Sequence, residues 1–304
     1  MSPRYLILGA GGIGGALGAH MLRGGLDVSF IARGRQLAAL TRTGLTLEKP
    51  GEVFSLGPVR AWDTETWAGE ADVIFLCVKG YSLEETVPFL QRAARRGTAV
   101  IPLLNLPDTG ERLQKLLPEA LTASGCIYIA SEVSAPGHIL MRGSILRPVF
   151  GLPGGGTSPI LERVREDLTA CGMDAVLSDN IRRDCLTKFS YVSAQGACGL
   201  YYGVSAGAMQ RPGEIRDCFS ALTAEIGLLA RAEGTDLGAD LQERNLKILD
   251  GVEPSMTTSL QRDILRGGPS EIDGLLFRVP EAGRARGVIL PNYERIAAAL
   301  RPKD

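Results

Sequence analysis

Five glycines stand where a strand-like apolar stretch meets a helical pattern, close to the start of this chain. The stretch "YLILGAGGIGGALGAHMLRGG" covers residues 5–25, and its glycines at 9, 11, 12, 14 and 15 mark the transition. Glycine weakens a helix because it loses more conformational freedom on folding than any other residue. A cluster at this point therefore predicts a tight strand–turn–helix unit whose backbone must approach another group closely.

The spacing of these glycines fits the pattern G-x-G-x-x-G. In that pattern Gly9 permits the turn, Gly11 lets the backbone approach a pyrophosphate, and Gly14 lets the helix pack against the sheet. The free N–H groups at the helix start favour an anion. The predicted dinucleotide-binding residues are Gly9, Ala10, Gly11, Gly12, Ile13 and Gly14. A glycine-rich turn in a non-binding α/β protein is the alternative.

The end of the second predicted strand discriminates between the two nicotinamide dinucleotides. A carboxylate usually stands there to bind the ribose hydroxyls of NAD, whereas this chain reads "FIARGR" with Arg33 and Arg35. A guanidinium can hold a 2′-phosphate through two hydrogen bonds, so we expect NADP(H) as the cofactor. The alternative is that both arginines are merely solvated at a helix start.

Strand and helix patterns alternate through the first half of the chain. We predict strands at 4–8, 27–31, 71–78 and 98–103, and helices at 13–23, 34–43, 82–95 and 108–116. We also expect a hairpin within 44–59, further strands within 120–150, a helix at 160–170 and a strand at 174–177. This alternation predicts a Rossmann-type, doubly wound parallel sheet in a domain spanning residues 1–178.

Helical periodicity dominates from residue 179 onward. Apolar residues at 215, 218, 219, 222, 226 and 229 recur every three or four positions, which predicts one buried helix face. Further helices are expected at 262–266, 275–286 and 291–300. The helical periodicity of residues 179–304 predicts an all-α domain, and we expect this domain to carry the substrate-binding and catalytic groups discussed below.

Composition narrows the possible partners. A net charge of −1 gives no reason to expect nucleic acid or an anionic membrane as a partner, and no apolar run approaches the ~20 residues of a bilayer span. Six cysteines without a C-x-x-C pair favour a reduced, cytoplasmic protein. No signal peptide and no metal site are expected.

Reduction of a carbonyl needs a group that donates a proton to the developing alkoxide. The chain has only two histidines, His20 and His138, and we expect His20 to be structural. Lys188 is a lone lysine in an apolar segment, where partial burial would lower its pKa and make it a usable acid. A surface lysine whose stem packs on the helix is an equally weighted alternative.

Two polar residues follow predicted parallel strands. Lys79 and Asn105 come after the third and fourth strands, at the sheet edge where doubly wound proteins bind ligands. Either could contact the cofactor or the reacting carbonyl. Ordinary polar loop residues are the alternative.

These motifs together resemble the ketopantoate reductase family over essentially the whole chain. The resemblance rests on "GAGGIG", "ARG" at 32–34, "CVK" at 77–79, "PLLN" at 102–105, "PG" at 136–137, the lysine segment and, most specifically, "TTSLQRDILRGGPSEIDGL" at 257–275. It implies NADPH-dependent reduction of 2-dehydropantoate to pantoate, a cleft between the domains as the site, and a possible homodimer.

The resemblance also implies roles for individual residues. Lys188 matches the general acid, and Glu271 matches an acid beside that lysine and the cofactor. Ser259 matches the cradle for the substrate carboxylate. The implied cofactor contacts are Arg33, Lys79, Asn105, Glu132 and Glu271, with Asn105 also close to the substrate.

The chain departs from the family pattern after Lys188. Family asparagines at i+4 and i+8 correspond to Val192 and Gly196, whereas Gln195 at i+7 lies on the same helix face and could bind substrate in part. A different 2-oxo acid or related carbonyl, or a non-catalytic NADP(H)-binding sensor, therefore stays open. A β-hydroxyacid or imine dehydrogenase is disfavoured by "SLQRD" and "SEID".

Overall fold

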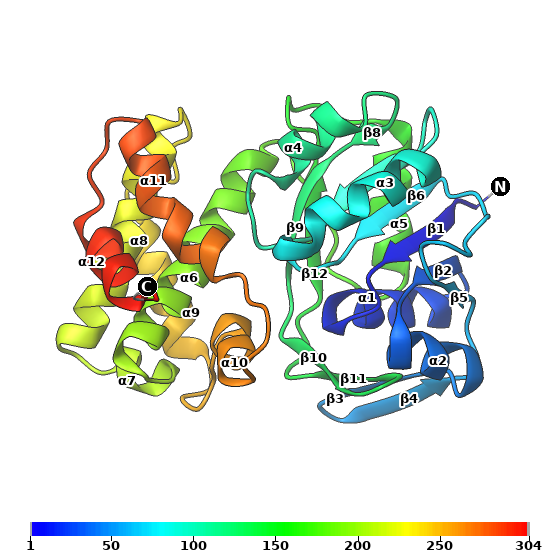
Figure 1. Cartoon of the computed structure of the whole chain (residues 1–304), viewed down its shortest axis with the longest axis horizontal. Helices are drawn as coiled ribbons and strands as arrows, with labels where there is room; N and C mark the ends of the chain where they lie inside the picture. Colours follow the sequence, from blue (N-terminus) through cyan, green and yellow to red (C-terminus); the bar gives the residue numbers. More distant parts are fainter. Residues whose placement is uncertain (1, 303–304) are drawn as a thin grey trace. The chain divides into compact units, whose positions relative to one another are not determined.

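The structure is a computed structural model that describes residues 2–302 (Figure 1). The chain divides into two compact units, Met1–Ile181 and Arg182–Asp304, whereas the sequence placed the domain boundary after residue 178. Among the described residues, no helix is both long enough and apolar enough to span a bilayer.

A six-stranded, fully parallel sheet forms the centre of the first unit. Its strand order is β5-β2-β1-β6-β7-β8, so the chain changes direction across the sheet between β2 and β6, on either side of β1. The bounds are β1 Arg4–Leu8, β2 Asp27–Ile31, β5 Ala61–Trp62, β6 Val73–Leu76, β7 Ala99–Pro102 and β8 Leu121–Thr122. The carboxyl edge at such a change of direction is where doubly wound proteins bind ligands.

Helices cover both faces of this sheet because its central strands are apolar on both sides. On one face Ile7, Phe30 and Phe75 pack with residues of α1 (Gly12–Arg23) and α5 (Pro159–Ala170). On the other face Leu6 and Ile74 pack with α3 (Leu83–Ala93) and α4 (Thr109–Leu116). The helix α2 is Gly34–Arg42. The doubly wound arrangement expected from the sequence is confirmed.

A second sheet, ordered β10-β11-β3-β4, lies against α1. Its strands are β3 Leu45–Lys49, β4 Glu52–Leu56, β10 Ser131–Ala135 and β11 His138–Met141. The expected hairpin at 44–59 is therefore the β3–β4 pair, and its β3 joins β11 in parallel register. A third sheet contains β9 Ser124–Tyr128, β12 Arg147–Gly151 and β13 Val176–Leu177.

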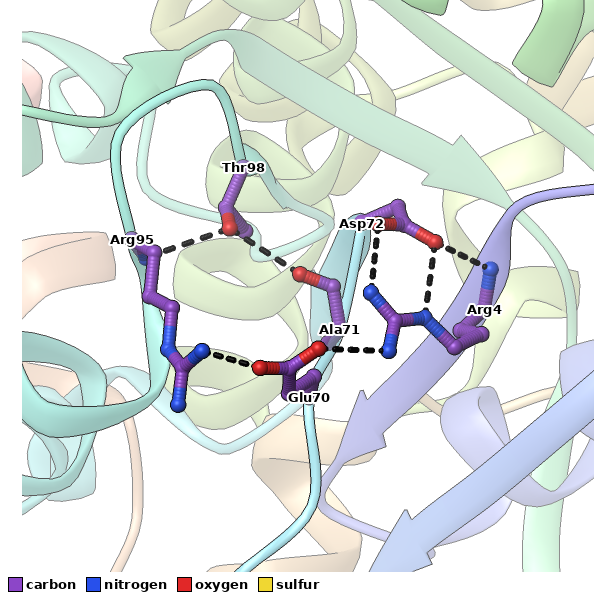
Figure 2. Close-up of polar contacts among 6 residues, drawn as sticks. All are labelled: Arg4, Glu70, Ala71, Asp72, Arg95 and Thr98. Carbon is purple, nitrogen blue, oxygen red and sulfur yellow. Dashed lines mark hydrogen bonds and ion pairs between the residues drawn. The ribbon is translucent and has the colours of Figure 1, made fainter.

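Ion pairs join the amino ends of β1, β6 and β7, at the edge opposite the glycine turn (Figure 2). Arg4 donates to Asp72 at 3.0 Å through both Nε and Nη2, and to Glu70 at 2.8 Å. Arg95 also pairs with Glu70, and Thr98 Oγ1 donates to the carbonyl of Ala71 at 2.9 Å. These groups are partly solvent-exposed, so their contribution to stability is small.

The described part of the second unit is helical, in agreement with the sequence. Its helices are α6 Ile181–Tyr202, α7 Ala206–Gln210, α8 Glu214–Ala232, α9 Leu241–Gly251, α10 Ser259–Leu265, η2 Asp273–Phe277, α11 Arg278–Ala285 and α12 Pro291–Leu300. The predicted apolar face of α8 is buried at Cys218, Phe219, Leu222, Ile226 and Leu229. A buried carboxylate, Glu225, accepts the N–H groups of Asn292 and Tyr293 and so fixes the first turn of α12.

Two predicted helix bounds in this unit are wrong. The helix expected at 262–266 begins earlier, at Ser259, because Thr258 and Gln261 form a reciprocal capping box. The helix expected at 275–286 begins within the wider turns of η2, and its α-helical part, α11, runs from Arg278 to Ala285.

Candidate active site

The glycine turn joins β1 to α1 at the carboxyl edge of the parallel sheet. Gly9 has φ +102°, a conformation that side chains rarely adopt, and a Cβ there would lie 3.0 Å from the backbone carbonyl of Cys77. A Cβ on Gly14 would overlap the carbonyl oxygen of Gly9. The protein's own backbone therefore excludes side chains at both positions.

Gly11 differs from its neighbours in the turn. A Cβ built on Gly11 would meet nothing within 4 Å, and the backbone there is extended, with φ −80°. Packing therefore does not require glycine at this position, while approach of a phosphate to the backbone would. No side chain caps α1 and its first turn carries no acidic residue, so its N–H groups suit an anion. The residues present fit a dinucleotide.

The other predicted cofactor residues of this unit belong to neighbouring strands. Arg33 follows β2, Lys79 follows β6 and Asn105 follows β7, so all three stand at the carboxyl edge that carries the glycine turn. Lys79 and Asn105 are half-buried. The sheet thus brings together residues that are up to about 100 positions apart in the chain.

Arg33 is the N-cap residue of α2 and projects into solvent. Its side chain is 83% exposed, and its Nη1 lies 3.7 Å from Oε2 of Glu85. Arg35 is exposed as well. A guanidinium held this loosely can reach a 2′-phosphate without the loss of a buried ion pair.

Glu132 lies beside the start of α1. A Cβ on Gly12 would lie 2.9 Å from the Cα of Glu132, so the β10 backbone passes directly over the glycine turn. Arg142 forms an ion pair with the Glu132 carboxylate, which is 14% exposed. The backbone of Glu132 is therefore placed next to the predicted phosphate-binding turn.

Gln36 also holds the turn, although no sequence motif indicates this role. Its Nε2 donates to the carbonyl of Ala10 at 2.8 Å, and its Oε1 accepts the N–H of Gly137 at 3.0 Å. One amide on α2 thus connects the glycine turn with the turn between β10 and β11. Only the packing of three distant segments reveals this role.

The predicted general acid lies in the interior of the second unit. Lys188 is 7% exposed in the middle of α6, and Glu271, just before η2, is 5% exposed. Charged side chains are rarely buried to this degree without a partner or a function. The structure therefore places Lys188 in the interior of the second unit and not at its surface.

The N-terminus of α10 packs against α6, the helix that carries Lys188. A Cβ on Gly196 would lie 3.1 Å from Cδ2 of Leu260 and 4.0 Å from Oγ1 of Thr258. Ser259, the first residue of α10, therefore stands beside the face of α6 that carries Gly196. The hydroxyl of Ser193, also on α6, donates to the Leu275 carbonyl and contacts the Tyr293 hydroxyl, so it already has partners within the second unit.

The two histidines lie in the first unit, and one of them is clearly structural. His20 is buried on α1, its Nδ1 lies 3.0 Å from the carbonyl oxygen of Ala16, and its ring meets Phe54 edge-on. Burial lowers the pKa of His20. His138 begins β11 and is exposed.

The first unit has a glycine turn at the carboxyl edge of a parallel sheet, and the second unit is helical and contains a buried lysine. These features together are typical of the class of dinucleotide-dependent oxidoreductases. Comparison with known proteins agrees. The family described as ketopantoate reductase PanE/ApbA matches residues 5–152, and its C-terminal domain matches residues 180–304. The chain belongs to the ketopantoate reductase family, whose members are oxidoreductases that act on CH–OH groups.

Individual relatives cover nearly the whole chain at low identity. A 2-dehydropantoate 2-reductase of Mesorhizobium japonicum is 29% identical, over 98% of this chain and 97% of its own. An uncharacterised oxidoreductase of Bacillus subtilis is 25% identical over 98% and 97%. The crystal structure of a 2-dehydropantoate 2-reductase from Porphyromonas gingivalis has 27% identity and a TM-score of 0.84, and covers 99% of each chain.

Proposed function

We propose that this protein reduces a 2-oxo acid to a 2-hydroxy acid with NADPH, and that 2-dehydropantoate is the first substrate to test. The observation that carries the proposal is the buried Lys188 on α6 in a chain of this family. Reduction of 2-dehydropantoate to pantoate would place the protein in pantothenate biosynthesis. We expect it to act in the cytoplasm.

NADPH supplies the hydride that reduces C2 of the substrate. The N–H groups at the start of α1 and the backbone of Gly11 hold the pyrophosphate, and Arg33 holds the 2′-phosphate. Lys79, Asn105 and the backbone of Glu132 complete the proposed cofactor contacts. The exposure of Arg33 and the empty space over Gly11 support this assignment.

Lys188 donates the proton to the carbonyl oxygen as it becomes an alkoxide. Glu271 orients the ammonium group of Lys188, and Asn105 assists in holding the carbonyl. Ser259, with the backbone of residues 256–258, binds the substrate carboxylate. Burial of Lys188 and Glu271 and the position of Ser259 beside α6 support these roles.

Lys188→Met tests the proposal most directly. With 2-dehydropantoate as substrate, NADPH oxidation should fall about 10²- to 10⁴-fold in kcat, the usual contribution of a general acid. NADPH affinity should stay within about twofold of wild type, because Lys188 is not assigned to the phosphate-binding residues. Lys247→Met, which changes an exposed lysine on α9, is the matched control and should behave as wild type.

Two other functions make different predictions in the same assay. A reductase of another 2-oxo acid would leave 2-dehydropantoate untouched and oxidise NADPH with a different member of a 2-oxo acid panel. A non-catalytic sensor would bind NADPH and consume none with any carbonyl. Val192 and Gly196 stand in place of the family's asparagines, which is the reason to consider both alternatives. The chain retains Lys188 and Glu271, which favours the reductase of another 2-oxo acid over the non-catalytic sensor.

A further inference from the structure

Two cysteines from different helices of the second unit lie against each other. Cys198 on α6 is fully buried, and Cys218 on α8 is 6% exposed. The Cys198 thiol donates to the carbonyl of Ile215 at 3.5 Å, and Ile215 precedes Cys218 by three residues on α8. Residues three apart share one face of a helix, so the Cys198 sulfur lies at the turn of α8 that carries Cys218. Contact between the two thiols raises the pKa of Cys198 and lowers that of Cys218.

A guanidinium group lies beside the Cys218 sulfur. Arg295 of α12 donates from Nη2 to Cys218 Sγ at 3.8 Å, and its guanidinium carbon lies 4.8 Å from the ring centroid of Tyr201. Among the described residues, no carboxylate forms an ion pair with Arg295, so its positive charge acts on the sulfur. A neighbouring cation stabilises the thiolate, which is the reactive form of cysteine.

The two thiols differ in their access to solvent. The Arg295 side chain is exposed, and Cys218 lies directly beneath it. Rotation of this long side chain opens Cys218 to a small molecule. Cys198 has no exposed surface, so its sulfur is reached through Cys218. One thiol is therefore placed to react with a reagent from solvent, and the other to react with the product.

We propose that Cys198 and Cys218 form a reversible disulfide, which cross-links α6 to α8 when a hydroperoxide oxidises Cys218. Cys218 reacts first, and Cys198 resolves the oxidised intermediate. All six cysteines are unbridged in the structure, and disulfides in reducing compartments are usually transient. A thiol reductant therefore restores both cysteines.

The reaction takes two steps with hydrogen peroxide as the oxidant. The Cys218 thiolate attacks one peroxide oxygen, so an S–O bond forms, the O–O bond breaks, and hydroxide leaves and takes up a proton as water. Cys218 is thereby oxidised to a sulfenic acid and the peroxide is reduced. The Cys198 sulfur then attacks the Cys218 sulfur. An S–S bond forms, the S–O bond breaks, and the leaving hydroxide takes the Cys198 proton as water.

Peptide mapping of the wild-type protein tests this disulfide. The protein is treated with a small excess of hydrogen peroxide, denatured, alkylated with N-ethylmaleimide and digested with trypsin without reduction. Trypsin cleaves after Lys188, Arg216 and Arg231, so the two cysteines fall on separate peptides, 189–216 and 217–231. The two peptides should appear linked, and dithiothreitol should separate them. Free Cys218 should disappear at least about tenfold faster than free Cys171.

Two variants assign the order of the steps. In Cys198→Ser the linked peptide should be absent, and dimedone should trap the sulfenic acid on Cys218. In Cys218→Ser the Cys198 thiol should stay free, because it is enclosed. Cys171→Ser is the matched control, since it removes a buried cysteine of the first unit that is 8% exposed, and it should give the wild-type linked peptide. Thermal denaturation of each variant checks its folding.

The wild-type measurement alone can overturn the proposal. Full alkylation of Cys198 and Cys218 after peroxide treatment would do so. Cys218 that accumulates as a sulfinic acid, or that links to any cysteine other than Cys198, would also contradict the pairing. The readout is covalent chemistry and not turnover, so either result leaves the proposed function untouched.

Discussion

Arg33 is the residue on which the proposed choice of NADPH over NADH depends. Its guanidinium is exposed and near one carboxylate, Glu85. Arg33→Ala should raise the Kd for NADPH about 10- to 100-fold, since a hydrogen bond to a charged group is worth roughly 1.5–3 kcal/mol. The Kd for NADH should not change, because NADH has no 2′-phosphate.

Fluorescence titration with the two nucleotides measures this difference. Arg42→Ala, at the other end of α2, is the control and should leave both affinities unchanged. Equal weakening of NADPH and NADH binding by Arg33→Ala would assign Arg33 to the fold of α2 and contradict the 2′-phosphate role.

Cys218 is the most acidic thiol that the structure indicates. The neighbouring Cys198 thiol and then the Arg295 guanidinium, whose Nη2 lies 3.8 Å from Sγ, lower the pKa of Cys218 below its ordinary value although burial opposes them. Burial raises the pKa values of Cys77 and Cys171. Cys218 should therefore become a thiolate at a lower pH than an ordinary thiol does.

Alkylation by iodoacetamide, followed by peptide mass spectrometry, tests the direction of this pKa shift. The rate at Cys218 should rise with pH to half its maximum below the ordinary thiol value of 9.0, and Cys77 and Cys171 should react more slowly at each pH. Arg295→Met should move the midpoint upward. A wild-type midpoint near the ordinary thiol value of 9.0 would contradict the lowered pKa.

At the scale of elements, the glycines of the β1–turn–α1 unit differ in the reason for which they are required. Packing of the fold requires some of them, and the proposed ligand requires one. Gly11→Ala should change stability by no more than about 1 kcal/mol, because the added Cβ has open space. It should weaken NADPH binding at least about tenfold, because the methyl group would occupy the space of the phosphate.

Two other glycines provide the comparison. Gly14→Ala should destabilise the fold by about 1–3 kcal/mol or prevent folding, because the Cβ would overlap the Gly9 carbonyl. Gly57→Ala, also in open space and outside the turn, should leave stability and binding unchanged. Urea denaturation and NADPH titration of the three variants give both quantities, and tight NADPH binding by Gly11→Ala would contradict the assignment.

Local sequence signals predicted most elements of this protein because those signals act over short distances. The strands β1 and β2 and the helix α12 match their predicted bounds, and α8 buries the predicted apolar face. The helix α10 begins three residues before its predicted start, because the capping box of Thr258 and Gln261 places the helix start at Ser259. The site residues are predictions that rest on sequence, and kinetics must test them.

At the scale of the whole molecule, nucleotide binding should increase the stability of the first unit. NADPH at about 100 times its Kd should stabilise that unit by ~2.7 kcal/mol, which corresponds to a rise in Tm of roughly 5–10 °C. Calorimetry with and without NADPH measures the shift. The shift should be strongly reduced in Gly11→Ala, and its absence in wild type would contradict cofactor binding.

The possible homodimer also belongs to this scale. The family resemblance implies it. Light scattering at several protein concentrations should give twice the chain mass of 32.4 kDa. A constant mass of one chain would contradict the expectation.

The sequence by itself determined the strand–turn–helix at the glycines, the alternation that makes a parallel sheet, and the helical second half. These follow from backbone propensity and from hydrophobic period, which depend on residues a few positions apart. Only the tertiary structure decided that β3 pairs with β11, that Gln36 holds the glycine turn, and that Leu260 fills the space over Gly196. Those contacts join residues far apart in the chain, so side-chain volume and the packing of distant segments decide them.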